Sequence, residues 1–178
     1  MKRPSEIRYT ERLRLEPLGP EHAEDLLRLF QEPSVEKWYG KWTPEKAKEE
    51  AERGKRGWDT NGVQKWMAYD RNTGGLVGRG GLSRMSVEGH HGLEVGWVLL
   101  DAYRGHGYAT EIGRAGLVFA FGELGADEVI SFTEARNTAS RAVMERLGLR
   151  FDHEFIWPGD GVRCVLYVLS REDWLPAG

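Results

Sequence analysis

The spacing of apolar and polar residues predicts strands and helices in the first third of the chain. Residues 12–16 read R-L-R-L-E, the two-residue period of a half-buried strand. Residues 23–30 carry an apolar stripe at helical spacing, which we expect Pro33 to end. Thr43-Pro44 then predicts the start of a second helix over 45–56. Its charged composition favours an exposed surface helix, and a lid beside a site is the alternative.

The pattern becomes strand-like between residues 63 and 100. Residues 66–69 and 76–82 flank the turn R-N-T-G-G at 71–75, which is a hairpin signal. A loop rich in glycine and histidine at 88–92 precedes a third apolar run at 93–100. We expect three antiparallel strands in succession.

The last third alternates helical and strand-like patterns. A helix is predicted after Arg104, a strand over 129–133, a helix over 139–147 closed by Gly148, and a hairpin of residues 151–157 and 163–169. The order strand, two helices, three strands, helix, strand, helix, two strands predicts an α+β fold around one mixed sheet. Residues 1–10 are expected to be a loose lead-in.

Composition narrows the class of protein. A length of 178 residues favours a single domain over 1–178. The net charge of -3 argues against a globally basic nucleic-acid binder. No apolar stretch approaches the ~20 residues of a membrane span, and the polar start is unlike a signal peptide, so a cytoplasmic protein with no membrane partner is expected. Cys164 alone supplies no disulfide and no multi-cysteine metal site, and we expect it in the core.

The segment that carries most chemistry is L-L-D-A-Y-R-G-H-G-Y-A-T at 99–110, where a strand ends, two glycines follow and a helix begins. Free N–H groups at a helix start bind phosphate, and Gly105 and Gly107 let the backbone approach an anion. Thr110 could add a hydroxyl donor. An ordinary strand-to-helix turn explains the same residues, so the loop alone leaves both interpretations open.

Three motifs together resemble the GNAT superfamily of acetyl-CoA-dependent N-acetyltransferases. The family's pyrophosphate loop is similar to R-G-H-G-Y-A at 104–109. Its second signature is similar to N-T-A-S at 137–140 followed by E-R-L-G-L at 145–149. Its ribosomal-protein N-terminal acetyltransferase branch (RimJ/RimL type) is resembled by L-E-V-G-W-V-L at 93–99. The resemblance implies a GNAT fold: a mixed, mostly antiparallel sheet of about seven strands, about four flanking helices, and a V-shaped splay between the parallel strands 93–100 and 129–133.

The resemblance also implies site residues. Backbone groups around Val98 and Leu99 would pair with the pantetheine arm of acetyl-CoA, as an added strand would. The pyrophosphate would be wrapped by Arg104, Gly105, His106, Gly107, Tyr108, Ala109 and Thr110. Asn137 and Ser140 would face the arm from the other side, and Arg141 would reach the 3′-phosphate or else be solvated.

Two residues are candidates for the chemistry itself. An amine must lose a proton before it attacks a thioester, and the resemblance implies Glu94 as that base, although a structural strand carboxylate is the alternative. The tyrosine that many members use as general acid is replaced by Met144. Ser140 is the candidate to protonate or hydrogen-bond the leaving sulfur; capping the helix start is its alternative role.

The expected function is therefore acetyl transfer from acetyl-CoA to a primary amine by direct attack, without a metal. The acceptor is a protein N-terminus or a small-molecule amine such as a polyamine or an amino-sugar antibiotic. An acyl-CoA-binding sensor without turnover is the alternative function, and the absence of a tyrosine at position 144, which is Met144, favours it.

His90-His91 is expected to be a solvated loop rather than a metal site. Two roles are open for the aromatic residues Trp38, Tyr39 and Trp42: they line the acceptor pocket, or they hold the helices against the sheet by packing (the stapling interpretation). The resemblance leaves a homodimer open.

Overall fold

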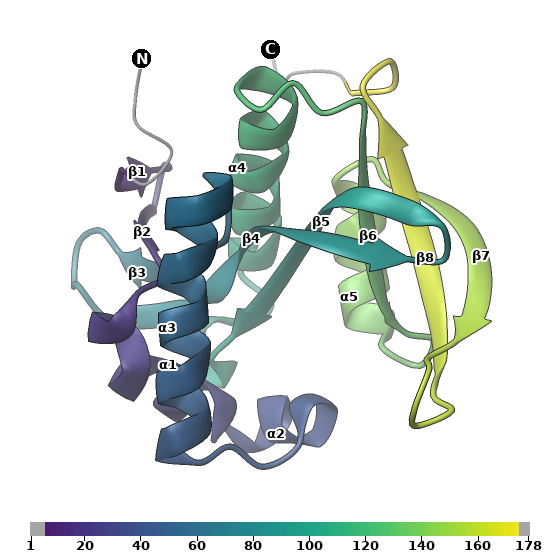
Figure 1. Ribbon diagram of the computed structural model, residues 1–178. Helices are drawn as coiled ribbons and strands as arrows, with labels where there is room; N and C mark the ends of the chain where they lie inside the picture. Colours follow the sequence, from purple (N-terminus) through teal and green to yellow (C-terminus); the bar gives the residue numbers. More distant parts are fainter. Residues whose placement is uncertain (1–5, 175–178) are drawn as a thin grey trace. The chain divides into compact units, whose positions relative to one another are not determined.

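The computed structural model describes residues 6–174, which form eight strands and five α-helices (Figure 1). The strands are β1 (Arg8–Tyr9), β2 (Leu13–Pro17), β3 (Lys65–Asp70), β4 (Leu76–Val87), β5 (His90–Leu99), β6 (Glu128–Glu134), β7 (Arg150–Ile156) and β8 (Arg163–Ser170). The helices are α1 (Ala23–Phe30), α2 (Pro33–Tyr39), α3 (Pro44–Asn61), α4 (Tyr108–Gly122) and α5 (Thr138–Arg146), with short 3-10 turns η1 (Pro20–His22) and η2 (Asp101–Tyr103). The sheet order is β1-β2-β3-β4-β5-β6-β8-β7, which confirms the predicted mixed α+β fold.

The predicted counts of about seven strands and about four helices were each one too low. The first addition is β1, which pairs antiparallel with β2 and is too short to show a period; it lies in the expected lead-in, of which residues 1–5 fall outside the described part. The second is α2, because Pro33 begins a helix where we expected it to end one. Proline is well suited to the first helical position, where no N–H is needed.

The chain divides into two compact units, Met1–Gly81 with Trp97–Ile112 and Leu82–Gly96 with Gly113–Gly178. Three elements, β4, β5 and α4, each run from one unit into the other.

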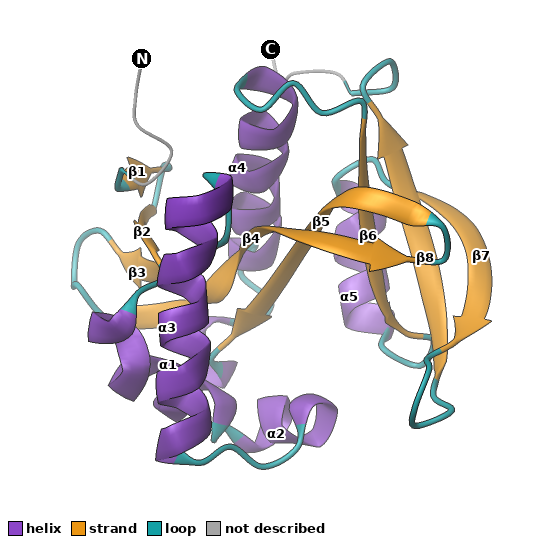
Figure 2. Ribbon diagram, in the orientation of Figure 1, coloured by secondary structure: helices purple, strands orange, loops and turns teal. Residues whose placement is uncertain are grey.

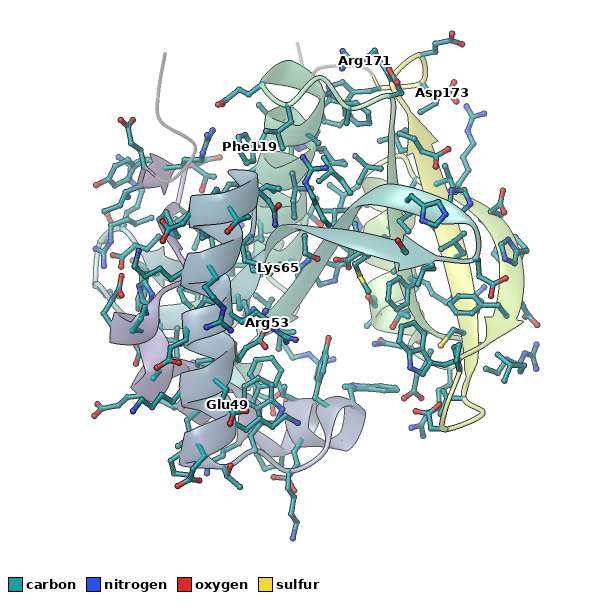
Figure 3. All side chains as sticks on the ribbon, viewed as in Figure 1. Glu49, Arg53, Lys65, Phe119, Arg171 and Asp173 are labelled. Atoms are coloured by element: carbon teal, nitrogen blue, oxygen red, sulfur yellow. The ribbon has the colours of Figure 1, made fainter. Side chains whose placement is uncertain are left out.

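The first unit has a core between α1, α3 and the antiparallel strands β2 and β3. Figure 1 shows α1 beside α3, and Leu26, Leu29 and Phe30 of α1 are fully or almost fully buried. The prediction of a solvated helix over 45–56 was wrong in two ways: α3 continues to Asn61, and one side of it is buried at Ala47, Ala51, Gly54, Gly57 and Trp58. Glycines caused the error, since a Cβ on Gly54 would lie 2.5 Å from Leu18 Cγ. Exposed charges such as Glu49 and Arg53 occupy the other side (Figure 3).

The early aromatic residues of this unit pack on α1. The Trp42 ring stacks on Phe30 with centroids 3.8 Å apart, and Tyr39 meets the same ring edge-on at 5.1 Å. Trp42 also packs against the buried core cluster of the unit. These contacts support the stapling interpretation for Trp42.

The second unit contains the parallel pair that the resemblance implied. Leu93 and Glu94 of β5 pair with Val129 and Ile130 of β6, and β6, β8 and β7 follow in antiparallel order. Figure 2 shows α5 beside this group of strands, and it contacts β6.

The expected glycine- and histidine-rich loop at 88–92 is a tight turn. Glu88 and Gly89 both have positive φ, 48° and 80°, which joins β4 directly to β5. Each histidine of the hairpin has a partner: His90 Nδ1 lies 2.6 Å from Oε1 of Glu128 on β6, and His91 Nδ1 lies 2.9 Å from Oγ of Ser86 on β4. Within residues 6–174 no group of three or more potential ligands is placed to hold a metal ion. Nor does any helix there have the length and apolar character needed to span a bilayer.

Candidate active site

The loop of residues 104–107 connects β5 and η2 to the start of α4 at Tyr108. Gly105 and Gly107 have φ of +76° and +82°, a conformation that side-chain-bearing residues rarely adopt. This conformation turns the chain sharply into the helix. The first amides of a helix have no carbonyl partner within it, so they form an anion site with the positive end of the helix dipole.

A buried polar atom supports a ligand at this junction. Thr110 Oγ1, in the first turn of α4, is inaccessible to solvent and has no hydrogen-bond partner within the described residues. Leaving a buried hydroxyl unpaired costs free energy, which a ligand oxygen would recover. The loop therefore fits the diphosphate of a coenzyme.

Arg104 in the loop and Tyr108 at the start of α4 both contact residues of the first unit. Arg104 Nη1 lies 3.4 Å from Asp101 Oδ1, and the Tyr108 ring meets Tyr103 edge-on at 5.4 Å. The His106 carbonyl accepts a hydrogen bond from Arg12 at 2.8 Å. The His106 main chain is thus held by Arg12, and the expected backbone role of His106 in binding the pyrophosphate stays a prediction.

Val98 and Leu99 lie at the end of β5, close to β4. A Cβ on Gly78 would lie 2.1 Å from the Val98 carbonyl oxygen, and the Leu100 N–H donates to the Val77 carbonyl at 3.0 Å. Because main-chain groups alternate in direction along a strand, those of Leu99 point away from β4. Of the two residues, Leu99 is therefore better placed to pair with an extended ligand.

Glu94 is a buried carboxylate in β5, with 8% of its surface exposed. The Ser83 hydroxyl on β4 donates a hydrogen bond to Glu94 Oε2 at 3.0 Å. A buried carboxylate is costly unless hydrogen bonds hold it, so its orientation is fixed by its neighbours. Ser83 was not expected from sequence, since only hairpin pairing brings it to Glu94.

The parallel pairing of β5 with β6 covers two residue pairs only, ending at Glu94 and Ile130. One residue further on, the buried Ser131 hydroxyl donates to the Val95 carbonyl at 2.7 Å. A side chain therefore satisfies a carbonyl that the backbone ladder leaves open, as expected where two strands begin to diverge.

Asn137 caps α5, accepting a hydrogen bond from the Ser140 N–H at 3.2 Å and donating to Thr133 Oγ1 at 3.2 Å. The cap role that we weighed for Ser140 therefore belongs to Asn137. Within the described residues the half-buried Ser140 hydroxyl has no hydrogen-bond partner, so it is available to a ligand. Met144 is buried, with 1% of its surface exposed.

Arg141 is held by its own unit rather than extended into solvent. Its Nη1 donates to the Ala135 carbonyl at 2.9 Å, and its Nε donates to the Tyr167 hydroxyl at 3.2 Å. The hydrogen bond to Tyr167 raises the pKa of the guanidinium above its ordinary value. The candidate residues fall into two sets: Val98, Leu99 and the loop at 104–110 in the first unit, and Glu94, Asn137, Ser140 and Arg141 in the second.

Comparison with known proteins adds an independent finding. Residues 12–150 match the family model described as an acetyltransferase (GNAT) domain. The FsC-acetyl coenzyme A-N(2)-transacetylase of Aspergillus fumigatus is 32% identical over 185 residues, covering 94% of this chain and 77% of that protein.

Two solved structures share the fold. A GNAT-family acetyltransferase from Bacillus anthracis superposes with a TM-score of 0.77 at 24% identity, covering 94% of this chain and 99% of its own. RimL, a ribosomal L7/L12 alpha-N-protein acetyltransferase in complex with coenzyme A, superposes with a TM-score of 0.73 at 16% identity, covering 93% and 98%.

Proposed function

The chain belongs to the GNAT acetyltransferase family and is an acyltransferase; from that premise we propose that it transfers the acetyl group of acetyl-CoA to a primary amine by direct attack. The observation that carries the choice of donor is the junction of the loop at 104–107 with α4. Two glycines with positive φ and the unpaired, buried Thr110 hydroxyl together form an uncharged cradle for a diphosphate.

Glu94 is the proposed base. The amine nitrogen must be neutral to attack the thioester carbon, so the proton that it loses passes to the Glu94 carboxylate, directly or through water. The new N–C bond forms as the C–S bond breaks, and the electron pair of that bond goes to sulfur. Ser83 supports this role because its hydroxyl donates to Oε2 and so helps to fix the orientation of the carboxylate.

Ser140 is the proposed donor to the departing sulfur. Its hydroxyl has no partner within the described residues, while its N–H is already bound by the Asn137 cap. The cap fixes the first turn of α5 and so fixes the position of this hydroxyl. Met144 has no proton to donate, so the usual tyrosine route is closed.

Two acceptor classes are proposed. The fold shared with the L7/L12 alpha-N-protein acetyltransferase supports a protein N-terminus. A small-molecule amine is the other class. The Aspergillus relative is named as an acetyl coenzyme A-N(2)-transacetylase, which supports acetyl transfer to a nitrogen atom.

The test is release of free thiol from acetyl-CoA with peptides bearing a free α-amine, polyamines and aminoglycosides as acceptors. We expect thiol release that depends on one of these amines, with the acetylated product identified by mass spectrometry. If the protein binds CoA but releases no thiol with any of these acceptors, the result would favour the alternative function, an acyl-CoA-binding sensor without turnover. Absence of CoA binding would contradict both functions.

A further inference from the structure

We infer that Arg12 is a positioning residue for the coenzyme, holding the loop at 104–107 in the conformation that binds a diphosphate. The inference rests on the proposed acetyl-CoA site and adds to it a residue that no loop motif contains. Arg12 precedes β2 and lies 94 positions before His106 in the chain.

Arg12 contacts the loop and the helix start through three parts of its guanidinium group. Nη1 donates to the His106 carbonyl at 2.8 Å, Nε donates to Glu111 Oε2 at 2.7 Å, and the group lies 4.0 Å from the centre of the Tyr108 ring. A planar guanidinium can make these contacts at once, because its donors diverge in one plane while its faces stack. An ammonium group cannot.

Glu111 makes the Arg12 position rigid. Besides Nε, its carboxylate accepts hydrogen bonds from the Arg12 main-chain N–H at 2.8 Å and the Thr10 hydroxyl at 2.6 Å. Burial acts to raise the pKa of Glu111, but the hydrogen bonds from Thr10 and Arg12 outweigh it and lower that pKa below its ordinary value. The carboxylate therefore stays charged and fixes both the backbone and the side chain of Arg12.

The effect on the loop follows from peptide geometry. The peptide between His106 and Gly107 is trans, so its C=O and N–H point in opposite directions. Since the His106 carbonyl is bound to Arg12, the Gly107 N–H is directed away from Arg12. A Cβ on Gly107 would lie 3.4 Å from Arg12 Nη2, so the guanidinium occupies the inner side of the loop. The outer side, with the Gly107 amide, faces the proposed anion.

Arg12 acts by orientation rather than by attracting the anion, because Glu111 already balances its charge. The first test is calorimetric titration of CoA into the wild type, Arg12→Gln and Arg12→Lys. We expect both variants to bind CoA about tenfold more weakly, about 1.4 kcal/mol. Arg14→Gln is the matched control, since Arg14 pairs with Glu16 at 2.7 Å and lies 5.2 Å from the Tyr69 ring, and we expect its affinity to be unchanged.

The second test separates positioning from general distortion. S-Acetylpantetheine carries the thioester but lacks the diphosphate, so a loop effect should not touch it. With an amine that the wild type acetylates, we expect Arg12→Lys to raise KM for acetyl-CoA about tenfold and to leave kcat and turnover of S-acetylpantetheine unchanged. Equal losses with both donors would overturn the inference and show a structural role only.

The outcomes also distinguish the inference from the proposed function. If the wild type binds no CoA, the proposed function fails. If the wild type binds CoA and Arg12→Lys binds it equally well, only the inference fails. Arg12→Lys retains the charge, so it gives this answer even if Arg12→Gln does not fold.

Discussion

At the scale of single residues, the proposed chemistry depends on a carboxylate placed where carboxylates are rare. Glu94 lies within a strand, almost fully buried, with the Ser83 hydroxyl 3.0 Å from Oε2. Burying a carboxylate costs free energy of folding, so a buried carboxylate is more readily explained by a proton-transfer role than by a purely structural one. An exposed carboxylate such as Glu128, paired with His90, shows no comparable burial.

Glu94→Gln tests this role directly. The amide retains the size of the side chain and can still accept from Ser83, but it cannot take a proton. We expect kcat to fall about 10²- to 10⁴-fold while the Kd of CoA, measured by calorimetry, stays unchanged. Glu128→Gln is the control on β6 and should leave both values unchanged. A pH–rate profile of wild-type shape and height in Glu94→Gln would exclude Glu94 as the base.

Residues within one contiguous motif were predictable from sequence, and their distant partners were not. The glycines at 105 and 107 depend on local backbone geometry, which short patterns encode. The cap of α5 was located only to within its motif, since we weighed that role for Ser140 and the structure gives it to Asn137. Arg12 and Ser83 depend on which strands lie side by side. Their own neighbours in sequence are ordinary strand residues, so no local signal could have indicated them.

At the scale of elements, the loop before α4 is the one on which the choice of donor depends. Gly107→Glu places a side chain on a residue with φ of +82° and brings a negative charge to the proposed anion site. We expect calorimetry to detect no CoA binding. The control is Gly89→Glu in the turn between β4 and β5, where φ is +80° and an added Cβ meets nothing within 4 Å. CoA binding by Gly107→Glu at the level of this control would contradict the loop assignment.

The same hairpin turn is tied to β7 by a titrating residue. His153 Nδ1 lies 2.5 Å from Asp152 Oδ2 and Nε2 lies 3.2 Å from Glu88 Oε2, and hydrogen bonds to Asp152 and then Glu88 raise the pKa of His153. A raised pKa means that the protonated imidazole stabilises the fold below about pH 6.5, its ordinary value. That contribution is lost as the pH rises through the folded-state pKa.

We therefore expect the Tm of the wild type to exceed that of His153→Gln at pH about 6 and to match it at pH about 9. Scanning calorimetry at both values checks this. His91→Gln is the control, since the partner of His91 is the neutral Ser86 hydroxyl. A difference of equal size at both pH values would show that the contact does not depend on charge.

Element types were predicted well, and element ends were not. The error at α3 arose because glycine has no side chain to contribute to an apolar stripe, although Gly54 is needed for the contact with Leu18. The two-residue turn at Glu88-Gly89 was not predicted, because the polar residues where β4 ends and β5 begins have a composition typical of loops. Packing between elements decided both.

At the scale of the whole molecule, the single domain expected from chain length can be tested through unfolding. The chain forms two compact units, yet β4, β5 and α4 each pass from one unit to the other. If one unit unfolds, the part of each shared strand or helix that lies in it unfolds too. The remaining part is then destabilised, since helices and small domains form cooperatively. Shared elements therefore couple the two units along the backbone itself.

Leu15→Ala perturbs only the first unit, where Leu15 is fully buried in β2, and should cost about 2–5 kcal/mol. Cys164 reports on the second unit: its thiol is buried, and burial raises its pKa, so it reacts only after unfolding. If the units unfold together, Leu15→Ala will increase the labelling rate of Cys164 about tenfold for each 1.4 kcal/mol of global stability lost, as measured by circular dichroism in urea. Unchanged Cys164 labelling in a destabilised Leu15→Ala protein would show that the second unit unfolds independently, and that the shared strands and helix do not make the chain one domain.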